Sequence, residues 1–490
     1  MGNSGLDIKL KGDKVIEQIP SIKDKALRIN LNENIYGTFA EIGAGQETVR
    51  HFFRAGGSSG TIAKAMSAYD KDFSDAIYGV ETDGRYVTES RLTRMLSHEV
   101  ELIEKRLDRA KHPNKLFFSY ANTVATIDFA KQFKGHGWVG IKYQLEPEEE
   151  YNEIILHIRF KETDARLQQE TLGILGVNLI YGAFYKYNDP KKLLRYLYDH
   201  LDKDQLEIDT INFSGPRFAN VDNRLMSLQL VKNGMTDAVM FSPDGHNILP
   251  AAVLYKKNIL ALRGSFRPVT KVNMDMLERS LEMFTKENKV EKENTFVIFE
   301  ITLSNLRSEG EIDERDFMDR AELLCSLGQT VMISNFQEYY KVVEYFSSYT
   351  KARMGLVMGV NNLVDIFDEK YYRHLSGGIL EAFGKLFYRD LKVYLYPMLE
   401  DGEVITSQNL KVHPRMKELY KFFAYNGKVI DVAGYDKENL KIFSREVLKM
   451  ISSGTSGWES LLPIGTAELI KHHKLFGYDP NKVLEDVTNA

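Results

Sequence analysis

A regular alternation of strand-like and helix-like segments between residues 151 and 424 constrains the fold of this chain most strongly. Apolar runs such as EIILHIRF, DAVMFS, NILALRGSF and TFVIFEITL are separated by amphipathic segments such as PKKLLRYLYDHL and VNMDMLERSLEMF. Parallel strands need long crossover connections, which helices usually provide. We therefore predict an α/β protein whose mostly parallel β/α-repeat core is covered by helices on both faces.

The number of repeats favours a closed barrel. About eight strand–helix units in roughly 270 residues match a TIM-type barrel, whereas an open doubly wound sheet more often has five to seven strands. The open sheet is the alternative, because the connection between DAVMFS and NILALRGSF is short for a full helix.

The rest of the chain is arranged around this core. Residues 1–26 are a polar lead-in, residues 27–150 form an N-terminal α/β region with glycine-rich loops, residues 151–424 are the core, and residues 425–490 form a helical C-terminal appendage. The acidic run EPEEEYNE, residues 146–153, marks the first internal boundary, and the tip of a hairpin in one continuous sheet is its alternative. From Arg91 onward, apolar residues at helical spacing predict an amphipathic helix.

Composition excludes several classes of protein. The chain has 490 residues, of which 43% are hydrophobic and 27% charged, as in ordinary soluble globular proteins. Its net charge of -5 gives no global attraction to nucleic acid, and we find no apolar run of signal-peptide or membrane-spanning length. Cys325 is the only cysteine, which excludes an intrachain disulfide. We expect a cytoplasmic protein without a metal site, and its oligomeric state, including a homo-oligomer, stays open.

Polar residues follow the predicted strands, and ligands of α/β proteins collect at the carboxyl ends of strands. The candidate residues selected by this rule are Asn212, Ser214, Ser242, Asp244, Arg263, Ser265, Arg267, Glu300, Thr302, Asn305, Ser334, Asn335, Asn361 and Asn362. The centre of this set is LRGSFRPVT, where Arg263 and Arg267 flank a Gly-Ser turn. Two guanidinium groups there would clamp one phosphate or carboxylate, with Glu300 or Asp244 as the acid or base. The alternative is that both arginines pair with carboxylates such as Glu300 and brace a loop.

Two glycine clusters precede helix-like segments in the N-terminal region. AGGSSGTIAKAM places Ser58, Ser59, Gly60 and Thr61 where backbone amides suit an anion, or where they simply end one segment and begin the next. TFAEIGAGQ resembles the strand and E-x-G-x-G turn of adenosylmethionine-dependent methyltransferases, but it lacks the glycine expected after that turn. His136, in KGHGWVG, is either a general acid–base or an exposed turn residue.

Several segments together resemble a known family. NIYGTFAEIGAGQE, AKAMSAYD, LGILGVNLIYGAF, VDNRLMSLQLV and RGSFRPVT are similar to a family of soluble bacterial proteins of comparable length, over residues 28 to 475. Members of that family have no assigned function and carry two conflicting names, nicotinate-nucleotide adenylyltransferase and TonB-dependent receptor. The second implies an exported β-barrel, which the alternating pattern excludes. The first implies an H-x-G-H motif after the first strand, for which KGHGW supplies one histidine.

We predict a cytoplasmic α/β protein that binds a phosphorylated or nucleotide-like small molecule. As an enzyme it would be a transferase acting on such a molecule, and the sequence does not identify its cofactor. The alternative is a non-catalytic assembly or scaffold protein, which tyrosine-rich stretches such as EYYKVVEYF and EKYYRHL favour.

Overall fold

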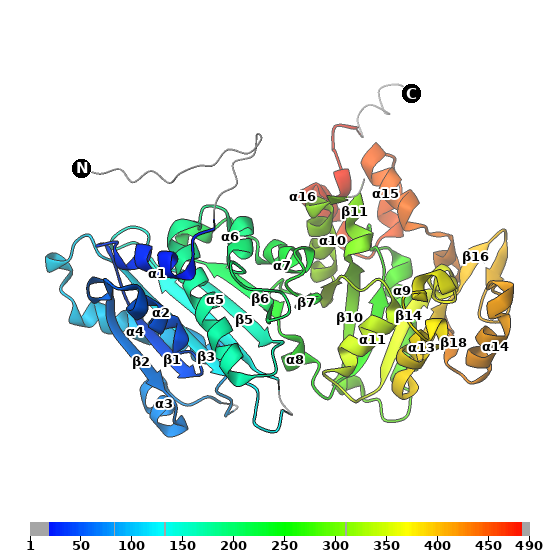
Figure 1. Cartoon of the computed structure of the whole chain (residues 1–490). Coiled ribbons are helices and arrows are strands. Elements are labelled where there is room, and N and C mark those ends of the chain that lie inside the picture. Colours follow the sequence, from blue (N-terminus) through cyan, green and yellow to red (C-terminus); the bar gives the residue numbers. More distant parts are fainter. Residues whose placement is uncertain (1–18, 83, 132–133, 309–310, 483–490) are drawn as a thin grey trace, which may run out of the picture. The chain divides into compact units, whose positions relative to one another are not determined.

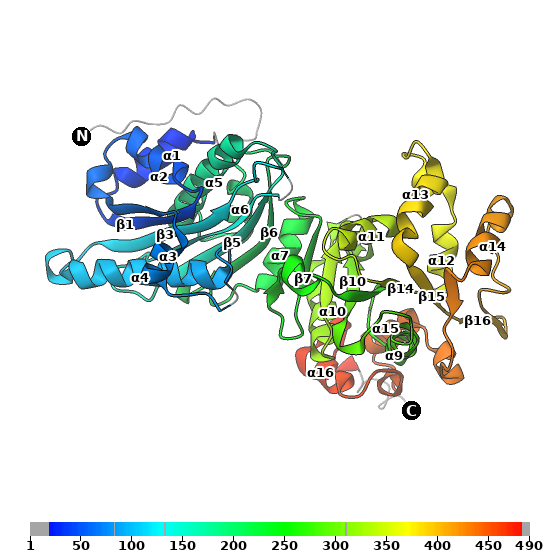
Figure 2. The same ribbon diagram turned by 90° about the horizontal axis from the view of Figure 1, so that it is seen from below.

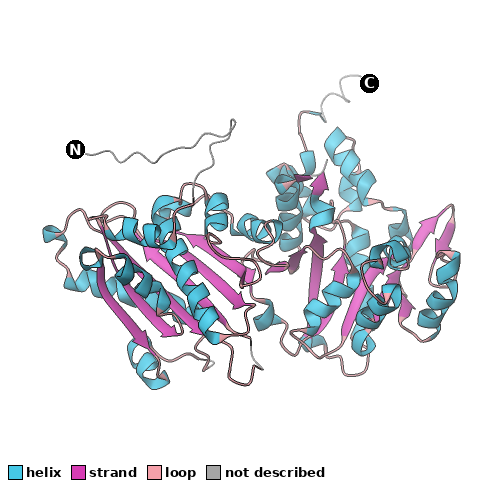
Figure 3. Ribbon diagram, in the orientation of Figure 1, coloured by secondary structure: helices cyan, strands magenta, loops and turns pink. Residues whose placement is uncertain are grey.

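The computed structural model describes residues 19–482 except residues 83, 132–133 and 309–310. The chain divides into two compact units, residues 1–221 and residues 222–490. Figure 1 labels their elements, and Figure 3 shows that helices and strands alternate in both units. Below we call them unit 1 and unit 2 and describe each by itself.

Unit 1 is built on a six-stranded mixed sheet. Its strands are β1 (Ile35–Gly43), β2 (Ile62–Ala68), β3 (Leu116–Ala125), β4 (His136–Tyr143), β5 (Asn152–Phe160) and β6 (Leu206–Ser214), in the order β2-β1-β3-β4-β5-β6. β1, β2 and β3 are parallel, and each later strand is antiparallel to the one before it. EPEEEYNE therefore joins the two strands of a hairpin, and the predicted division at residue 150 falls inside this sheet.

Helices cover both faces of the unit 1 sheet (Figure 2). One face carries α1 (Ile22–Asn30), α2 (Glu47–Ala55) and α5 (Ala165–Tyr185), with α6 (Pro190–Tyr196) near α5, and the other carries α4 (Glu89–Arg106) with α3 (Lys71–Tyr78) beside it. The helix predicted from Arg91 is α4, which begins after the N-cap Thr88 and buries Leu92, Met95, Leu96, Val100 and Ile103. The predicted lead-in ends within α1, and its residues 1–18 lie outside the described residues.

Unit 2 is built on an eight-stranded sheet. Its strands are β7 (Ala238–Phe241), β8 (Asn247–Ile248), β9 (Asn258–Arg263), β10 (Thr295–Thr302), β13 (Val331–Ser334), β14 (Met354–Gly359), β15 (Lys392–Tyr396) and β18 (Val429–Asp431). The order is β18-β15-β14-β9-β10-β13-β7-β8, in which the six strands from β18 to β13 are parallel and β7 is antiparallel to both neighbours. Two two-stranded ribbons accompany it, β11 (Arg307–Ser308) with β12 (Glu311–Ile312) and β16 (Met398–Glu400) with β17 (Glu403–Ile405).

The expected closed barrel is wrong, because the described strands of unit 2 form an open sheet with β18 and β8 at its edges. The sheet grows from β9 in both directions: β10 and β13 extend one side, and the chain then returns to place β14, β15 and β18 on the other. Numbered along the chain, the six parallel strands have the order 3-2-1-4-5-6 of a doubly wound dinucleotide-binding fold. The open alternative therefore describes this unit.

Helices on opposite faces follow the two halves of this order. α9 (Lys271–Phe284) and α10 (Glu314–Ser326) lie on one face, and α11 (Tyr339–Ser347), α12 (Val360–Ile366) and α13 (Gly378–Leu386) lie on the other (Figure 2). α7 (Asn223–Lys232), α8 (Pro250–Val253) and α14 (Lys417–Tyr425) complete the unit, and the predicted C-terminal helices are present as α15 (Ser444–Ser453) and α16 (Thr466–His473). Among the helices described here, none has the length and apolar character needed to span a bilayer.

Candidate functional site

A cavity of about 680 Å³ lies at the carboxyl ends of β9, β10, β13 and β14 in unit 2. The loops after these strands and the first residues of α9, α11 and α12 contribute its walls, with Tyr371, Tyr372, Ser444 and Arg445 from later in the chain. The strand order reverses between β9 and β14, so their loops leave toward opposite faces and leave a crevice between them. The position of the cavity thus follows from the topology of the sheet.

Arg263 lies in the wall of this cavity and forms a buried ion pair behind it with Glu300. Arg263, the last residue of β9, donates from Nε to Glu300 Oε2 at 2.8 Å and from Nη2 to Glu300 Oε1 at 2.8 Å, and its Nη1 donates to the Gln337 carbonyl at 3.1 Å. Ser334 Oγ donates to Glu300 Oε1 at 2.6 Å, and the guanidinium lies over the Tyr339 ring at 4.3 Å. Burial alone would lower the pKa of Arg263, but the charge of Glu300 raises it, so the guanidinium stays charged.

The second predicted arginine binds a different carboxylate. Arg267 Nε pairs with Asp316 on α10, and Asp316 also pairs with the buried Arg320. Arg320 Nη1 donates at 2.9 Å to the Ser265 carbonyl and to the Asn305 carbonyl, which holds the turn after β9 against the loop after β10. Arg263 and Arg267 thus brace the site through separate ion pairs, as in the alternative weighed for them above.

The remaining walls combine small polar side chains with aromatic rings. Ser265, Asn273, Thr302, Ser304, Asn305 and Asn362 line the cavity together with Phe266, Tyr339, Tyr371 and Tyr372. Arg445 is exposed, and within the described part of the chain it has no hydrogen bond or ion pair, so its guanidinium is available to a ligand. Burial raises the pKa of Tyr339 to about 12, so its hydroxyl keeps its proton at neutral pH.

The other candidate residues of unit 2 lie outside the cavity wall. Ser334 Oγ donates to Glu300, which in turn binds Arg263 of the wall, and Asn335 Nδ2 donates to Asp237 Oδ1 at 3.0 Å. Asp244 occupies an exposed turn, where its carboxylate accepts hydrogen bonds from Ser242 Oγ and the His246 amide. The hydrogen bond from Ser242 lowers the pKa of Asp244, so the side chain is ionised rather than poised as an acid.

Asn212 and the serine-glycine cluster belong to unit 1. Asn212 lies on β6, because the strand assigned to the β/α core pairs with β5 instead. Ser58, Ser59 and Gly60 form a short 3-10 turn, and the buried Thr61 Oγ1 donates to the Asn30 carbonyl at 3.0 Å. Ser59 and Gly60 line a shallow groove with Lys111, His112 and Lys115. The cluster thus serves a connection in unit 1 and is not part of the unit 2 cavity.

The connection from β9 to α9 differs from the motif that the adenylyltransferase name implies. It reads GSFRPVTKVN and contains no histidine. Asn273 Oδ1 instead accepts hydrogen bonds from the Thr270 amide at 2.9 Å and the Thr270 hydroxyl at 3.2 Å, which closes the first turn of α9. His136, the histidine of KGHGW, begins the antiparallel strand β4 of unit 1. No described group of three or more histidine, cysteine or acidic side chains is arranged to hold a metal ion.

Sequence reasoning found the loops after β9, β10 and β14, in which Ser265, Asn305 and Asn362 line the cavity, and missed the part of the wall that comes from later in the chain. Arg445, Tyr371 and Tyr372 reach the cavity from segments more than 100 residues after β9. Asn362, which is half-buried, could be found because it follows a glycine at the end of a strand, which is the pattern of a ligand loop. Arg445, Tyr371 and Tyr372 do not directly follow a strand, so this pattern does not select them.

Comparison with solved structures gives only distant likenesses. A CinA-superfamily protein from Enterobacter cloacae has a TM-score of 0.26 and 13% identity, covering 36% of this chain and 99% of its own. A competence/damage-inducible protein from Agrobacterium tumefaciens has a TM-score of 0.24 and 16% identity, covering 38% of this chain and 100% of its own. The nicotinic acid mononucleotide adenylyltransferase of Plasmodium falciparum, complexed with APC, has a TM-score of 0.29 and 13% identity, covering 46% of this chain and 99% of its own. No protein-family model and no curated protein matches the chain.

Proposed function

We propose that unit 2 binds a phosphorylated or nucleotide-like small molecule in the cavity between β9 and β14, as the binding step of a transferase. One observation carries the proposal: a cavity of about 680 Å³ lies where the 3-2-1-4-5-6 strand order reverses. Small-molecule sites commonly have volumes of about 300–1,000 Å³ and occupy this position in open α/β sheets.

The side chains of the wall suit the parts of such a ligand. Tyr371, which is 40% exposed, offers an aromatic face of the kind on which a planar base stacks. Ser265 and Asn305 offer hydroxyl and amide groups for a sugar, and the exposed Arg445 offers a guanidinium for a phosphate. Arg263 and Glu300 hold the floor in a fixed geometry, so the wall needs little ordering when a ligand binds.

The tyrosine-rich stretches, which favoured a scaffold, are largely core. Tyr340 and Tyr372 are each 4% exposed, and their ring centroids lie 6.4 Å apart. Buried rings of this kind stabilise the packing of α11 and leave little aromatic surface for an assembly partner. We therefore favour the ligand-binding function over the scaffold.

The proposal is tested by differential scanning fluorimetry of the full chain with a panel of nucleotides, sugar phosphates and their unphosphorylated counterparts. A member of the panel that binds should raise the midpoint of unit 2, since binding to the native state alone stabilises it. Arg445→Ala should reduce the shift for phosphorylated ligands, and the equally exposed Arg415→Ala, whose side chain does not line the cavity, should leave it unchanged. A panel without any shift, or a shift that both variants retain, would contradict the proposal.

A further inference from the structure

Three side chains form a hydrogen-bonded chain in unit 1, far in sequence from the cavity residues. Asp209 Oδ1 lies 2.6 Å from His157 Nδ1, and His157 Nε2 lies 3.2 Å from His136 Nδ1. The side chains of Asp209 and His157 are each 3% exposed, whereas His136 is partly exposed. The chain therefore leads from a buried carboxylate to an imidazole at the surface.

The hydrogen-bonded chain of side chains ends at the edge of the sheet where the parallel strands of unit 1 terminate. β4 is antiparallel to β3, so its first residue, His136, is paired with Ala125 at the end of β3. In the neighbouring strand β1, the glycine turn begins at Gly43, which is paired with Val124. The partly exposed His136 thus lies at the edge of an α/β sheet where ligands collect.

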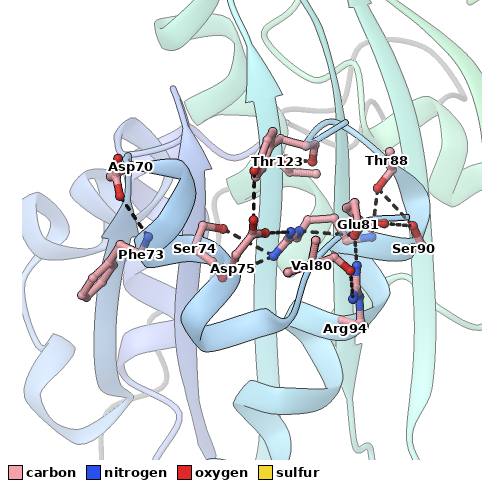
Figure 4. A network of polar contacts seen from close by, with 12 residues as sticks. Asp70, Phe73, Ser74, Asp75, Val80, Glu81, Thr88, Ser90, Arg94 and Thr123 are labelled. Atoms are coloured by element: carbon pink, nitrogen blue, oxygen red, sulfur yellow. Dashed lines mark hydrogen bonds and ion pairs between the residues drawn. The ribbon is translucent and has the colours of Figure 1, made fainter. Parts of the chain in front are cut away.

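The wall beside it is rigid. Trp138 lies against the His157 ring with centroids 5.0 Å apart, and its cross-strand partner Thr123 donates to the Tyr86 carbonyl at 2.7 Å. Tyr86 belongs to the connection between α3 and α4, which the buried Arg91 fixes through Asp75 and Glu81. Figure 4 shows Asp75, Glu81 and Thr123 within this network of polar contacts. The two histidines therefore lie on paired strands, beside a connection that ion pairs hold in place.

The hydrogen bonds define where the protons lie. Burial alone would raise the pKa of Asp209, but its interactions with His157 and Arg159 lower it, so Asp209 is an ionised acceptor. His157 must then donate from Nδ1, which leaves its Nε2 as the acceptor for the Nδ1 proton of a neutral His136. In this tautomer His136 Nε2 carries a lone pair and no proton.

We propose that His136 Nε2 is a general base of unit 1, with His157 and Asp209 as positioning residues, for a bound hydroxyl compound or water. When Nε2 takes the hydroxyl proton, the Nδ1 proton of His136 passes to His157 Nε2. The products are an oxyanion, a neutral His136 protonated on Nε2, and an imidazolium at His157 paired with Asp209. Arg159, the cross-strand partner of His136, brings a positive charge to the side on which the oxyanion forms.

Two measurements on the full chain test the tautomer and the reactivity of His136. Long-range ¹H–¹⁵N correlation spectra should show His136 with its proton on Nδ1 and a bare Nε2 at neutral pH, and no imidazolium down to about pH 5, since burial lowers the pKa of His136 to about 4. Diethyl pyrocarbonate acylates bare imidazole nitrogens, and peptide mapping locates the adduct. Its rate at His136 should stay level from pH 7 to pH 5.5, while that of N-acetylhistidine falls about tenfold.

A matched pair of variants tests the roles of the positioning residues. The amide of Asp209→Asn can donate to His157 Nδ1, which moves the His157 proton to Nε2 and forces the His136 proton to Nε2 as well. The acylation rate at His136 should therefore fall at least about tenfold in a variant that keeps the wild-type circular dichroism. Asp204→Asn, at an exposed acid before the same strand, should keep the wild-type rate.

Each measurement can overturn the proposal. A wild-type His136 that carries its proton on Nε2, or that resists acylation in the folded protein, has no lone pair available to a ligand. An Asp209→Asn variant that is folded and acylated at the wild-type rate would show that the buried carboxylate does not set the tautomer. The wild-type spectra decide the question by themselves where the variant fails to fold.

Discussion

Each unit buries one carboxyl group near the carboxyl end of an inner strand, and the two groups have opposite environments. In unit 2, Glu300 is 1% exposed and is bound by the guanidinium of Arg263 and the hydroxyl of Ser334. In unit 1, Glu41 on β1 is 2% exposed, and its Oε1 has no hydrogen-bond partner among the described residues. Burial, with the charge of Glu47 as a smaller cause, raises the pKa of Glu41 to about 8.

This difference shows two solutions to one problem. Removing a charge from water costs several kcal/mol, which a protein offsets with a counter-charge or avoids by keeping the group protonated. Unit 2 uses the counter-charge, so its floor should be insensitive to pH near neutrality. Unit 1 keeps a proton on Glu41, so its stability should depend on pH.

The two tryptophans of the chain allow the units to be followed separately. Trp138 lies in β4 of unit 1 and Trp458 in the C-terminal part of unit 2, and both are almost fully buried. In protein labelled with 5-fluorotryptophan, their two ¹⁹F signals report the unfolding of each unit in urea. The stability predictions below use this measurement.

The largest effect should come from leaving Glu300 without its partner. Arg263→Met should reduce the free energy of unfolding of unit 2 by about 3–5 kcal/mol, because it leaves a buried charge uncompensated. The double variant Arg263→Met, Glu300→Leu should recover most of this loss, since both charges are gone. Equal losses in the single and double variants would mean that the pair contributes packing alone.

The pH dependence of unit 1 should be the next largest effect. The folded-state pKa of Glu41, about 8, is above its unfolded value of 4.5, so the native state holds the extra proton. Its stabilisation is complete below pH 4.5 and is lost as pH rises toward 8, by up to roughly 1.4 kcal/mol per pH unit. Glu41→Gln should remove this slope from the Trp138 signal and stabilise unit 1 at pH 9.

Glu41→Gln should leave the Trp458 signal as it is at every pH. A slope in the Trp138 signal that persists in Glu41→Gln would assign the pH dependence of unit 1 to another group.

A smaller effect should distinguish the glycine turns of the two units. A Cβ at Gly45 would lie 2.1 Å from the Asn122 side chain, whereas one at Gly359 would meet no atom within 4 Å. Gly45→Ala should therefore destabilise unit 1 by about 1–3 kcal/mol, and Gly359→Ala should change unit 2 by less than about 0.5 kcal/mol. Similar costs at both positions would show that Asn122 moves away freely.

The smallest effect should fall on the starts of two helices. Thr270→Ala removes the hydroxyl that donates to Asn273 Oδ1 at the start of α9, and Thr88→Ala removes the acceptor of the Arg91 amide at the start of α4. Each should cost its own unit about 1 kcal/mol. Thr270→Ala should retain the ligand shifts of unit 2 in scanning fluorimetry, since Thr270 does not line the cavity.

The local part of the fold was predictable and the order of the strands was not. The spacing of Leu92, Met95 and Leu96 predicts α4 because it needs only neighbouring residues. A barrel and an open sheet share the same alternation of strands and helices, and they differ in which distant strands pair. The stretch SGPRFANVDN, which spans the division after Val221, is rich in turn residues, and this signal was available for the domain boundary.

The candidate site was predictable to the same extent. Arg263 and Ser265 could be placed because both lie in or directly after a strand of the correct sheet. Asn212 has the same sequence pattern, but β6 pairs within unit 1. Arg445 comes from a helix whose position only the tertiary fold defines. Whether a polar residue after a strand is a ligand or a brace depends on its spatial partners, as Glu300 shows for Arg263.

The pairing of Arg263 with Glu300 also limits how the sequence can diverge. A change at either position alone leaves an unpaired charge inside the protein, so selection should eliminate most such single substitutions. In an alignment of orthologues, the two columns should therefore vary together, as arginine with an acid or as two uncharged residues. A lineage that keeps only the arginine or only the acid should carry a new residue of opposite charge beside the one that remains.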